Sequence, residues 1–307
     1  MAEKSRARYK TAVSNFERHH GSLPTSDPQL MDEALSQYLD YLFWEGEELW
    51  QGTLTFAAVL HEWPKLGRGD KAAMPKSRQG LQGWKRLAPA RARLPLPWLL
   101  VAAAAHWTAE RVSLNMCLIS ILSFVCYLRP GVGAKLVKEQ FTPPLRERKA
   151  GEPIGPEHVW CVNLHPQEWE VCSKTGTFDE TIEVTDLEHW SWLGPCLQAR
   201  IGNRHVGKSW GRQQTASLPS HGEGEPVMLE TQAEWSRALQ AAFQELGVPA
   251  DNVPHLYRLR HGGASHDVAY RLRGLPAVQK RGAWKTTTSV ARYSKPARLN
   301  EQIKAMS

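Results

Sequence analysis

The segment KRLAPARARLPLPW, residues 85–98, most constrains how this chain can fold, because its three prolines interrupt any helix or strand that runs through it. The segment is rich in arginine and has no apolar period, which is typical of an extended linker between domains. The chain has 307 residues, of which 42% are hydrophobic, enough to form two cores. We therefore expect one domain over residues 1–93, ending in this linker, and a second over 94–307.

The first region has a helical pattern. A set of apolar residues falls on one helical face, namely Met31, Leu35, Tyr38, Leu39 and Leu42. The stretch SRQGLQGWKRL predicts another helix near 77–87. We expect residues 1–88 to form a small helical domain.

The second region is expected to open with a long helix and to continue with a small sheet. The helix is indicated by the spacing of Leu114, Leu118, Ile121, Leu122 and Val125, and Pro130 is expected to end it just after Arg129. Three β-prone runs follow, HVWCVNL, EWEVCSK and ETIEV, and KTGTFD forms the turn between the last two. The fold class is therefore mostly α, with an α+β second domain that holds a small three-stranded antiparallel sheet.

Further helices are expected toward the C-terminus. One is predicted around 187–200, followed by a loop rich in glycine and serine to about residue 225. The clearest helix is TQAEWSRALQAAFQELG. It begins with a capping box of Thr231 and Glu234 and ends at Gly247.

The charge of the chain favours a polyanionic partner. The formal net charge is +7 and the pI is about 9.2. From residue 251 onward the acidic residues are Asp251, Asp267 and Glu301, against the cations Arg258, Arg260, Arg271, Arg273, Lys280, Arg281, Lys285, Arg292, Lys295, Arg298 and Lys304. The C-terminal fifth is the expected phosphate-facing surface.

Several classes of protein are not supported by the sequence. The longest apolar runs are shorter than the roughly 18 residues that a membrane span requires, and the charged N-terminus has no apolar stretch of a secretory signal behind it. The five cysteines form no CxxC pair and are expected to be buried reduced thiols. We expect an intracellular protein, nuclear in a eukaryote and otherwise cytoplasmic, with no membrane partner.

The stretch GNRHVGKS, residues 202–209, matches the phosphate-loop pattern GxxxxGK[ST]. That loop works between a buried strand and a helix, whose N-terminus faces the phosphates. Neither flank of the stretch has the required pattern. We therefore interpret it as a basic surface loop and not as a nucleotide site.

Four segments stand in an order that carries more information than any of them alone. CYLRPGVGAKL contains Arg129, CSKTGTFDETIEV contains Lys174, and YRLRHGGASHD contains Arg260. GAWKTTTSVARY places Trp284 nine residues before Tyr293. In this order the segments resemble the two arginine boxes, the lysine hairpin and the tyrosine box of the tyrosine recombinase (phage-integrase-like) family.

The resemblance covers the chain from about residue 95 to its end, and the first domain is similar in kind to the family's helical core-binding domain. It implies cleavage and rejoining of double-stranded DNA through a 3′-phosphotyrosine intermediate, as in the recombination or integration of mobile elements. It implies no metal or other cofactor and a homo-oligomer, a tetramer, on DNA. The target sequence, and whether DNA is integrated or excised, stay open.

The chemistry accounts for the residue types. A tyrosine phenol, here Tyr293, can be linked covalently to a phosphate and later expelled. The guanidiniums of Arg129 and Arg260 can stabilise the charge that develops on the phosphate oxygens, and Lys174 can protonate the departing oxygen. Trp284 can donate its indole N–H to the phosphate. Tyr257 and His261 are candidates to help with the proton of the nucleophile. The candidates for contacts to DNA are His255, His261, Lys285 and Arg292. The glycines beside Arg260 are expected to let the helix and the DNA backbone come close.

Three positions depart from the family pattern. Tyr257 stands where the family usually has histidine, Val132 where it often has glutamate, and Trp284 where histidine is commoner. The first two leave open a relative that binds DNA but cuts it weakly or not at all. A type IB topoisomerase, which uses the same residue types to relax DNA, is a further alternative.

Overall fold

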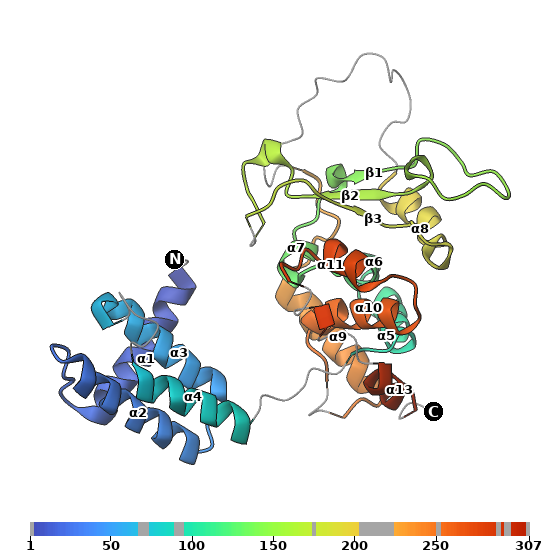
Figure 1. The fold of residues 1–307 in the computed structure, drawn as a ribbon. Helices are drawn as coiled ribbons and strands as arrows, with labels where there is room; N and C mark the ends of the chain where they lie inside the picture. Colours follow the sequence, from blue (N-terminus) through green and yellow to red (C-terminus); the bar gives the residue numbers. More distant parts are fainter. Residues whose placement is uncertain are drawn as a thin grey trace. The chain divides into compact units, whose positions relative to one another are not determined.

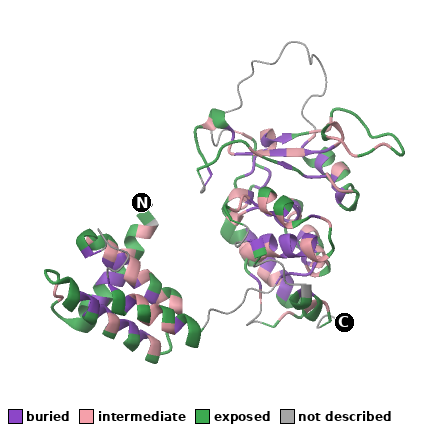
Figure 2. Cartoon of the chain, viewed as in Figure 1, coloured by how far each residue is buried: buried purple, intermediate pink, exposed green. Residues whose placement is uncertain are grey.

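The computed structural model describes residues 3–66, 74–88, 95–173, 176–202, 224–249, 253–286, 290–291 and 296–304. The chain divides into two compact units, Met1–Ala92 and Arg93–Ser307, and each is described by itself (Figure 1). In both units the buried residues lie along the inward faces of the helices (Figure 2). Among the described helices, none has the length and apolar character that a membrane crossing requires.

The described residues of the first unit form four α-helices, α1 (Glu3–His20), α2 (Pro28–Trp44), α3 (Leu49–Glu62) and α4 (Pro75–Leu87). Helix α1 contacts α3, and α2 contacts α4. All five apolar residues of the predicted α2 face are buried, which confirms the helical pattern. Helix α4 continues through Leu87, so the expectation of an extended linker from Lys85 was wrong for its first three residues; residues 89–94 lie outside the described part.

Asp32 joins α2 to the start of α4. Its carboxylate is buried and accepts hydrogen bonds from the backbone N–H groups of Lys76 and Ser77, at 2.8 and 2.9 Å. The first N–H groups of a helix have no partner inside the helix. A side chain from another helix therefore caps α4 and fixes its position.

The second unit opens with α5 (Trp98–Arg111), a helix that the sequence pattern did not predict. Helix α6 (Leu114–Val125) follows, packs against α5, and has the predicted residues Leu118, Leu122 and Val125 buried. Helix α10 (Tyr257–Ala269) packs on α6, and α9 (Gln232–Glu245) packs on α5. The other described helices are α7 (Pro130–Gly133), α8 (Leu193–Arg200), α11 (Leu275–Arg281) and α13 (Pro296–Lys304), which lies against α10 of the same chain.

The sheet has three antiparallel strands in the order β1 (Phe141–Thr142), β2 (Cys161–Leu164) and β3 (Glu180–Glu183). The predicted three-stranded sheet is thus confirmed, but one predicted strand is wrong. In the run EWEVCSK a 3₁₀ turn spans Gln167–Trp169, and Glu170 has a left-handed backbone with φ of 54°. The third strand is instead the two-residue β1, so KTGTFD lies within a longer connection from β2 to β3.

The remaining expectations have mixed outcomes. Helix α9 begins with the predicted capping box and is followed by Gly247 at φ of 81°, which confirms both its ends. The predicted helix around 187–200 divides into a 3₁₀ turn, Glu188–Trp190, and α8. The expectation of buried thiols was wrong for most cysteines, because only Cys126 is buried, although all five are free.

Candidate active site

Arg129 lies at the start of a short helix, and not at the end of the long one as the sequence predicted. Helix α6 ends at Val125, and Arg129 is the N-cap of α7, with extended backbone. Pro130 occupies the first turn of α7, where a missing N–H costs nothing. It therefore begins a helix at the place where we expected it to stop one. The side chain of Arg129 is half-buried and makes no hydrogen bond or ion pair with the rest of the described chain.

Arg260 projects from α10 and is only 3% exposed. Its Nη1 donates to the carbonyl of Tyr127, and its Nη2 donates to the carbonyl of Gly282 at 2.5 Å. The guanidinium also lies over the ring of Trp284, 4.3 Å from the ring centroid, a cation–π contact. Two backbone carbonyls and an aromatic face thus hold the side chain in place.

Arg129 and Arg260, the candidates from the two arginine boxes, line one cleft, and a third guanidinium from Arg281 lines it too. The other lining residues are Tyr127, Leu128, Val132, Leu164, Glu180, Ile182, Gly282 and Ala283. The space for the centre of a water-sized atom is only about 10 Å³, which is room for about one such atom. The single carboxylate among the described lining residues, that of Glu180, accepts a hydrogen bond from Thr177. The cleft is therefore electropositive and suits a small anionic oxygen.

A neighbouring cleft of about 400 Å³ shares Glu180, Ile182, Arg281 and Ala283 with the first one. The residues that precede and begin β3, Thr177–Thr181, line it together with Trp284 and Lys285. This cleft brings the end of the β2–β3 connection beside the predicted tyrosine box. Lys174, Arg292 and Tyr293 themselves lie outside the described residues. Val290, three residues before Tyr293, is buried with Tyr127 and Ala264.

Three further candidates lie on or before α10. The rings of Tyr257 and His261 are one helical turn apart and 5.0 Å between centroids, and His255 precedes the helix and is exposed. The walls of the two clefts, as the described residues form them, do not include these side chains. The structure therefore groups Arg129, Arg260, Trp284 and Lys285 around adjoining clefts, and it places Tyr257 and His261 on the helix that carries Arg260.

The glycines of α10 serve a contact inside the protein. A Cβ at Gly263 would lie 1.9 Å from the carbonyl oxygen of Phe124, and one at Gly262 would lie 2.8 Å from that of Leu96. Both glycines are buried, so the expectation that they admit the DNA backbone was wrong. Gly263 lets α10 pack backbone to backbone on the end of α6, and Gly262 lets it pack on the segment before α5.

A buried charge network supports the cleft. Asp267 accepts hydrogen bonds from the phenol of Tyr127 and from Arg273, and Arg273 also pairs with Asp186 at 2.5 Å. Burial by itself would raise the pKa of Asp267, but the hydrogen bond with His266, the charge of Arg273 and the hydrogen bond from Tyr127 outweigh burial and lower it. Burial, with the charge of Asp267, raises the pKa of Tyr127 well above its usual range. Tyr127 is thus a neutral donor that anchors the turn whose carbonyl holds Arg260.

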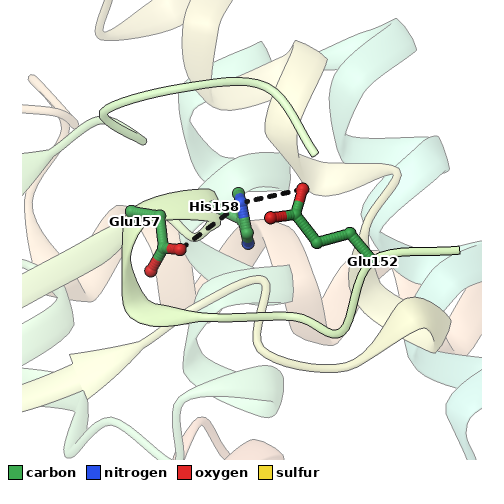
Figure 3. A group of neighbouring side chains, drawn as sticks. All are labelled: Glu152, Glu157 and His158. Atoms are coloured by element: carbon green, nitrogen blue, oxygen red, sulfur yellow. Dashed lines mark ion pairs between the residues drawn. The ribbon is translucent and has the colours of Figure 1, made fainter. Parts of the chain in front are cut away.

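One group of side chains outside the cleft has the composition of a metal site. Glu152, Glu157 and His158 lie together between β1 and β2, with His158 between the two carboxylates (Figure 3). Arg146 pairs with both glutamates, and its hydrogen bond lowers the pKa of Glu152 to about 2. The backbone N–H of Gly155 donates to Nδ1 of His158 at 3.0 Å, so the proton of the neutral ring is on Nε2, which faces the glutamates at 3.6 Å. A metal bound at Nε2 would need the opposite tautomer, so the arrangement suits an ion-pair cluster.

The phosphate-loop match begins directly after a helix. The residues before Gly202 form α8 and its C-cap Ile201, where a nucleotide-binding loop would need a buried strand. Residues 203–209 of the match lie outside the described part. The helical flank agrees with the interpretation of this stretch as something other than a nucleotide site.

Solved structures with a similar fold are enzymes that act on DNA. One is a XerH site-specific recombinase bound to a palindromic difH substrate, with TM-score 0.57 and 15% identity over 97% of this chain and 78% of that chain. A lambda integrase dimer bound to a core site matches with TM-score 0.57 and 13% identity, over 96% and 90%. The Tn1549 transposon integrase in complex with circular intermediate DNA matches with TM-score 0.61 and 11% identity, over 98% and 94%. No protein-family model matches the sequence, and no curated protein is significantly similar to it.

Proposed function

Because the chain has the fold of the tyrosine recombinases, we propose that it cuts and rejoins double-stranded DNA through a 3′-phosphotyrosine intermediate, as a site-specific recombinase or integrase. The observation that carries the proposal is the cleft in which Arg129 and Arg260 meet. Arg129 has no anionic partner among the described residues, and Arg260 is held by carbonyls and by Trp284. Guanidiniums that converge on one small cleft are a site for a phosphate.

The residues then act in sequence. The phenol of Tyr293 gives up its proton with the help of Tyr257 or His261 and attacks the scissile phosphorus. A 3′-phosphotyrosine bond forms while the bond to the 5′ oxygen breaks. Arg129 and Arg260 stabilise the charge on the non-bridging oxygens. Lys174 protonates the departing 5′ oxygen, and Trp284 holds Arg260 through its ring face.

The two units have separate tasks in this proposal. Residues 1–93 bind duplex DNA, and residues 94–307 hold the chemistry. Lys285 and Arg292 contact the DNA backbone, with His255 and His261 from the region of α10. The protein works as a tetramer on paired DNA sites, and in an intracellular compartment.

The test does not need a known target sequence. The purified protein is incubated with a library of nicked duplexes that contain random sequence, which trap a covalent intermediate because the short cleaved strand diffuses away. Adducts are isolated after denaturation, and their DNA is sequenced. We expect adducts that share a sequence with the wild type, and none with Tyr293→Phe, which should still bind the recovered DNA.

Other outcomes would identify the alternatives. Binding to duplex DNA without any adduct would indicate an inactive relative. Relaxation of supercoiled plasmid by a monomer, without sequence preference, would indicate a topoisomerase. An adduct that persists in Tyr293→Phe would assign the nucleophile to another residue.

A substitution at Tyr257 tests whether proton transfer at this position limits the rate of DNA cleavage. A phenol has an ordinary pKa near 10 and is a poor base at neutral pH, whereas a histidine has one near 6.5. Tyr257→His should therefore cut faster than the wild type at pH 8, and the gain should disappear below about pH 6.5. Equal rates between pH 5.5 and 8.5 would show that this position does not limit proton transfer.

A further inference from the structure

Arg281, at the C-terminal end of α11, is a buried arginine that none of the four sequence motifs singled out. Its side chain is 7% exposed. Nε donates to the carbonyl of Val125 at 3.0 Å, and Nη1 donates to that of Glu183 at 2.7 Å. The guanidinium is thus fixed between the end of α6 and β3.

The third nitrogen of this guanidinium has no hydrogen-bond partner among the described residues. Nη2 of Arg281 is buried and makes no hydrogen bond with any residue that the structure describes. A buried charged donor without an acceptor is destabilising, so each such group in a folded protein calls for an explanation. The hydrogen bonds of Nε and Nη1 are enough to join α6 to β3. This structural role does not explain why Nη2 is buried without a hydrogen bond.

The charge of Arg281 is also only partly compensated. The nearest carboxylate oxygen, from Asp186, is 3.7 Å away, and Asp186 pairs more closely with Arg273. On another side the guanidinium lies over the ring of Tyr127, 5.7 Å from the centroid. Neither contact supplies an acceptor for Nη2.

An acceptor for Nη2 can bind in the arginine-lined cleft. Arg281 lines it together with Arg129 and Arg260, and the cleft has room for about one water-sized atom, which is the size of a phosphate oxygen. We propose that Arg281 is a third phosphate-binding residue, whose Nη2 donates to a non-bridging oxygen of the scissile phosphate. This inference rests on the proposed function, and it adds a group that binds the same phosphate from the α11 side. As attack raises the phosphate from one negative charge to two, a fixed third guanidinium stabilises the transition state more than the substrate.

The experiment compares a charged with an uncharged phosphate. Nicked duplexes of the recovered target are made with either a normal phosphate or a neutral methylphosphonate at the scissile position. Arg281→Met should slow cleavage of the phosphate about 100-fold, as expected for the loss of one oxyanion donor, and should slow the methylphosphonate less than about 10-fold. The matched control is Arg273→Met, which removes a buried arginine whose partners are Asp267 and Asp186 and which should affect both substrates equally. Equal losses on the two substrates with Arg281→Met would overturn the proposal, because a structural clamp does not sense the charge of the phosphate.

A second measurement does not depend on cleavage. Orthovanadate, a small oxyanion, should raise the melting temperature of the wild type, and this shift should be lost in Arg281→Met but kept in Arg273→Met. If the wild type forms no DNA adduct, the proposed function fails, while the vanadate result still decides whether Arg281 belongs to an anion site. No shift in the wild type, or an equal shift in Arg281→Met, would sink the assignment of Arg281.

Discussion

Replacing Gly263 with alanine should force α10 away from α6 and dismantle the arginine cleft. The new Cβ would lie 1.9 Å from the carbonyl oxygen of Phe124 and 3.0 Å from a ring carbon of Tyr127. To reach an ordinary contact, the two backbones must separate by roughly 1.5 Å, because a carbonyl oxygen cannot rotate out of the way as a flexible side chain can. Overpacking of this kind lowers the free energy of unfolding by about 1–3 kcal/mol or more, whereas the higher helix propensity of alanine raises it by only about 1 kcal/mol. Because the clash is with a backbone carbonyl, we take the upper end of this range, about 3 kcal/mol, and expect a net loss of about 2 kcal/mol in the free energy of unfolding.

The same displacement should reach Arg260, which is one turn before Gly263 on α10. Its donors to Tyr127 and Gly282 sit at short hydrogen-bond distances, and a shift of roughly 1.5 Å takes such a pair beyond the range of a hydrogen bond. Gly263→Ala should therefore lose cleavage activity even under conditions in which it stays folded.

Urea denaturation followed by tryptophan fluorescence measures the first effect. The control is Gly83→Ala in α4, where a Cβ would meet no atom within 4 Å and where alanine should stabilise the helix by about 1 kcal/mol. The two substitutions make the same chemical change in two helices, so their opposite signs isolate the contact with Phe124. A Gly263→Ala protein as stable as the wild type would refute the close packing of α10 on α6.

Three other substitutions test separate features by denaturation. Thr231→Ala removes the hydroxyl that accepts from the N–H of Glu234, and it should cost about 1 kcal/mol, with an unchanged stability arguing against the capping box. Asp32→Ala leaves two N–H groups at the start of α4 without their charged acceptor and should cost at least about 1.5–3 kcal/mol; a smaller loss would mean that water replaces the carboxylate. Asp267→Asn should cost about 1–3 kcal/mol at pH 7, because Arg273 loses a charged acceptor but keeps Asp186. The pKa of Asp267 is lowered in the folded protein, so its ionised form stabilises the fold above the ordinary value of 3.8, and this stabilisation is lost as the pH falls below that value. The free energies of unfolding of wild type and Asp267→Asn should therefore converge in acid. A difference that stays constant with pH would contradict an ionised Asp267.

Elements whose signals are local were predictable from the sequence. Helix α9 has its cap, its apolar face and its terminating glycine within one stretch, and α2 has five buried residues at one spacing. Helix α5 was missed because it is rich in alanine and carries no clear apolar stripe. The run EWEVCSK alternates as a strand does, but the left-handed Glu170 breaks it, and β1 is too short for any pattern to reveal.

The sequence names candidate site residues only where a family motif marks them. The two arginine boxes name Arg129 and Arg260, and the structure places both in one cleft. Arg281 belongs to none of these motifs. Its partners are the backbone carbonyls of Val125 and Glu183, and every residue type has such a carbonyl, so the sequence does not reveal the contact. The glycines of α10 were assigned to DNA because the sequence does not show which backbone passes beside them.

Helix α10 has a composition that also controls when the cleft can form. It is 13 residues long, and Gly262 and Gly263 each make a helix about 1 kcal/mol less favourable than alanine would. Isolated helices of this length are marginal even without glycine. The segment therefore becomes helical only when it docks on α6, and Arg260 reaches the cleft in that same step. A nascent or partly refolded chain thus has no assembled arginine cleft, and under the proposed function it can hold DNA by charge but cannot break it.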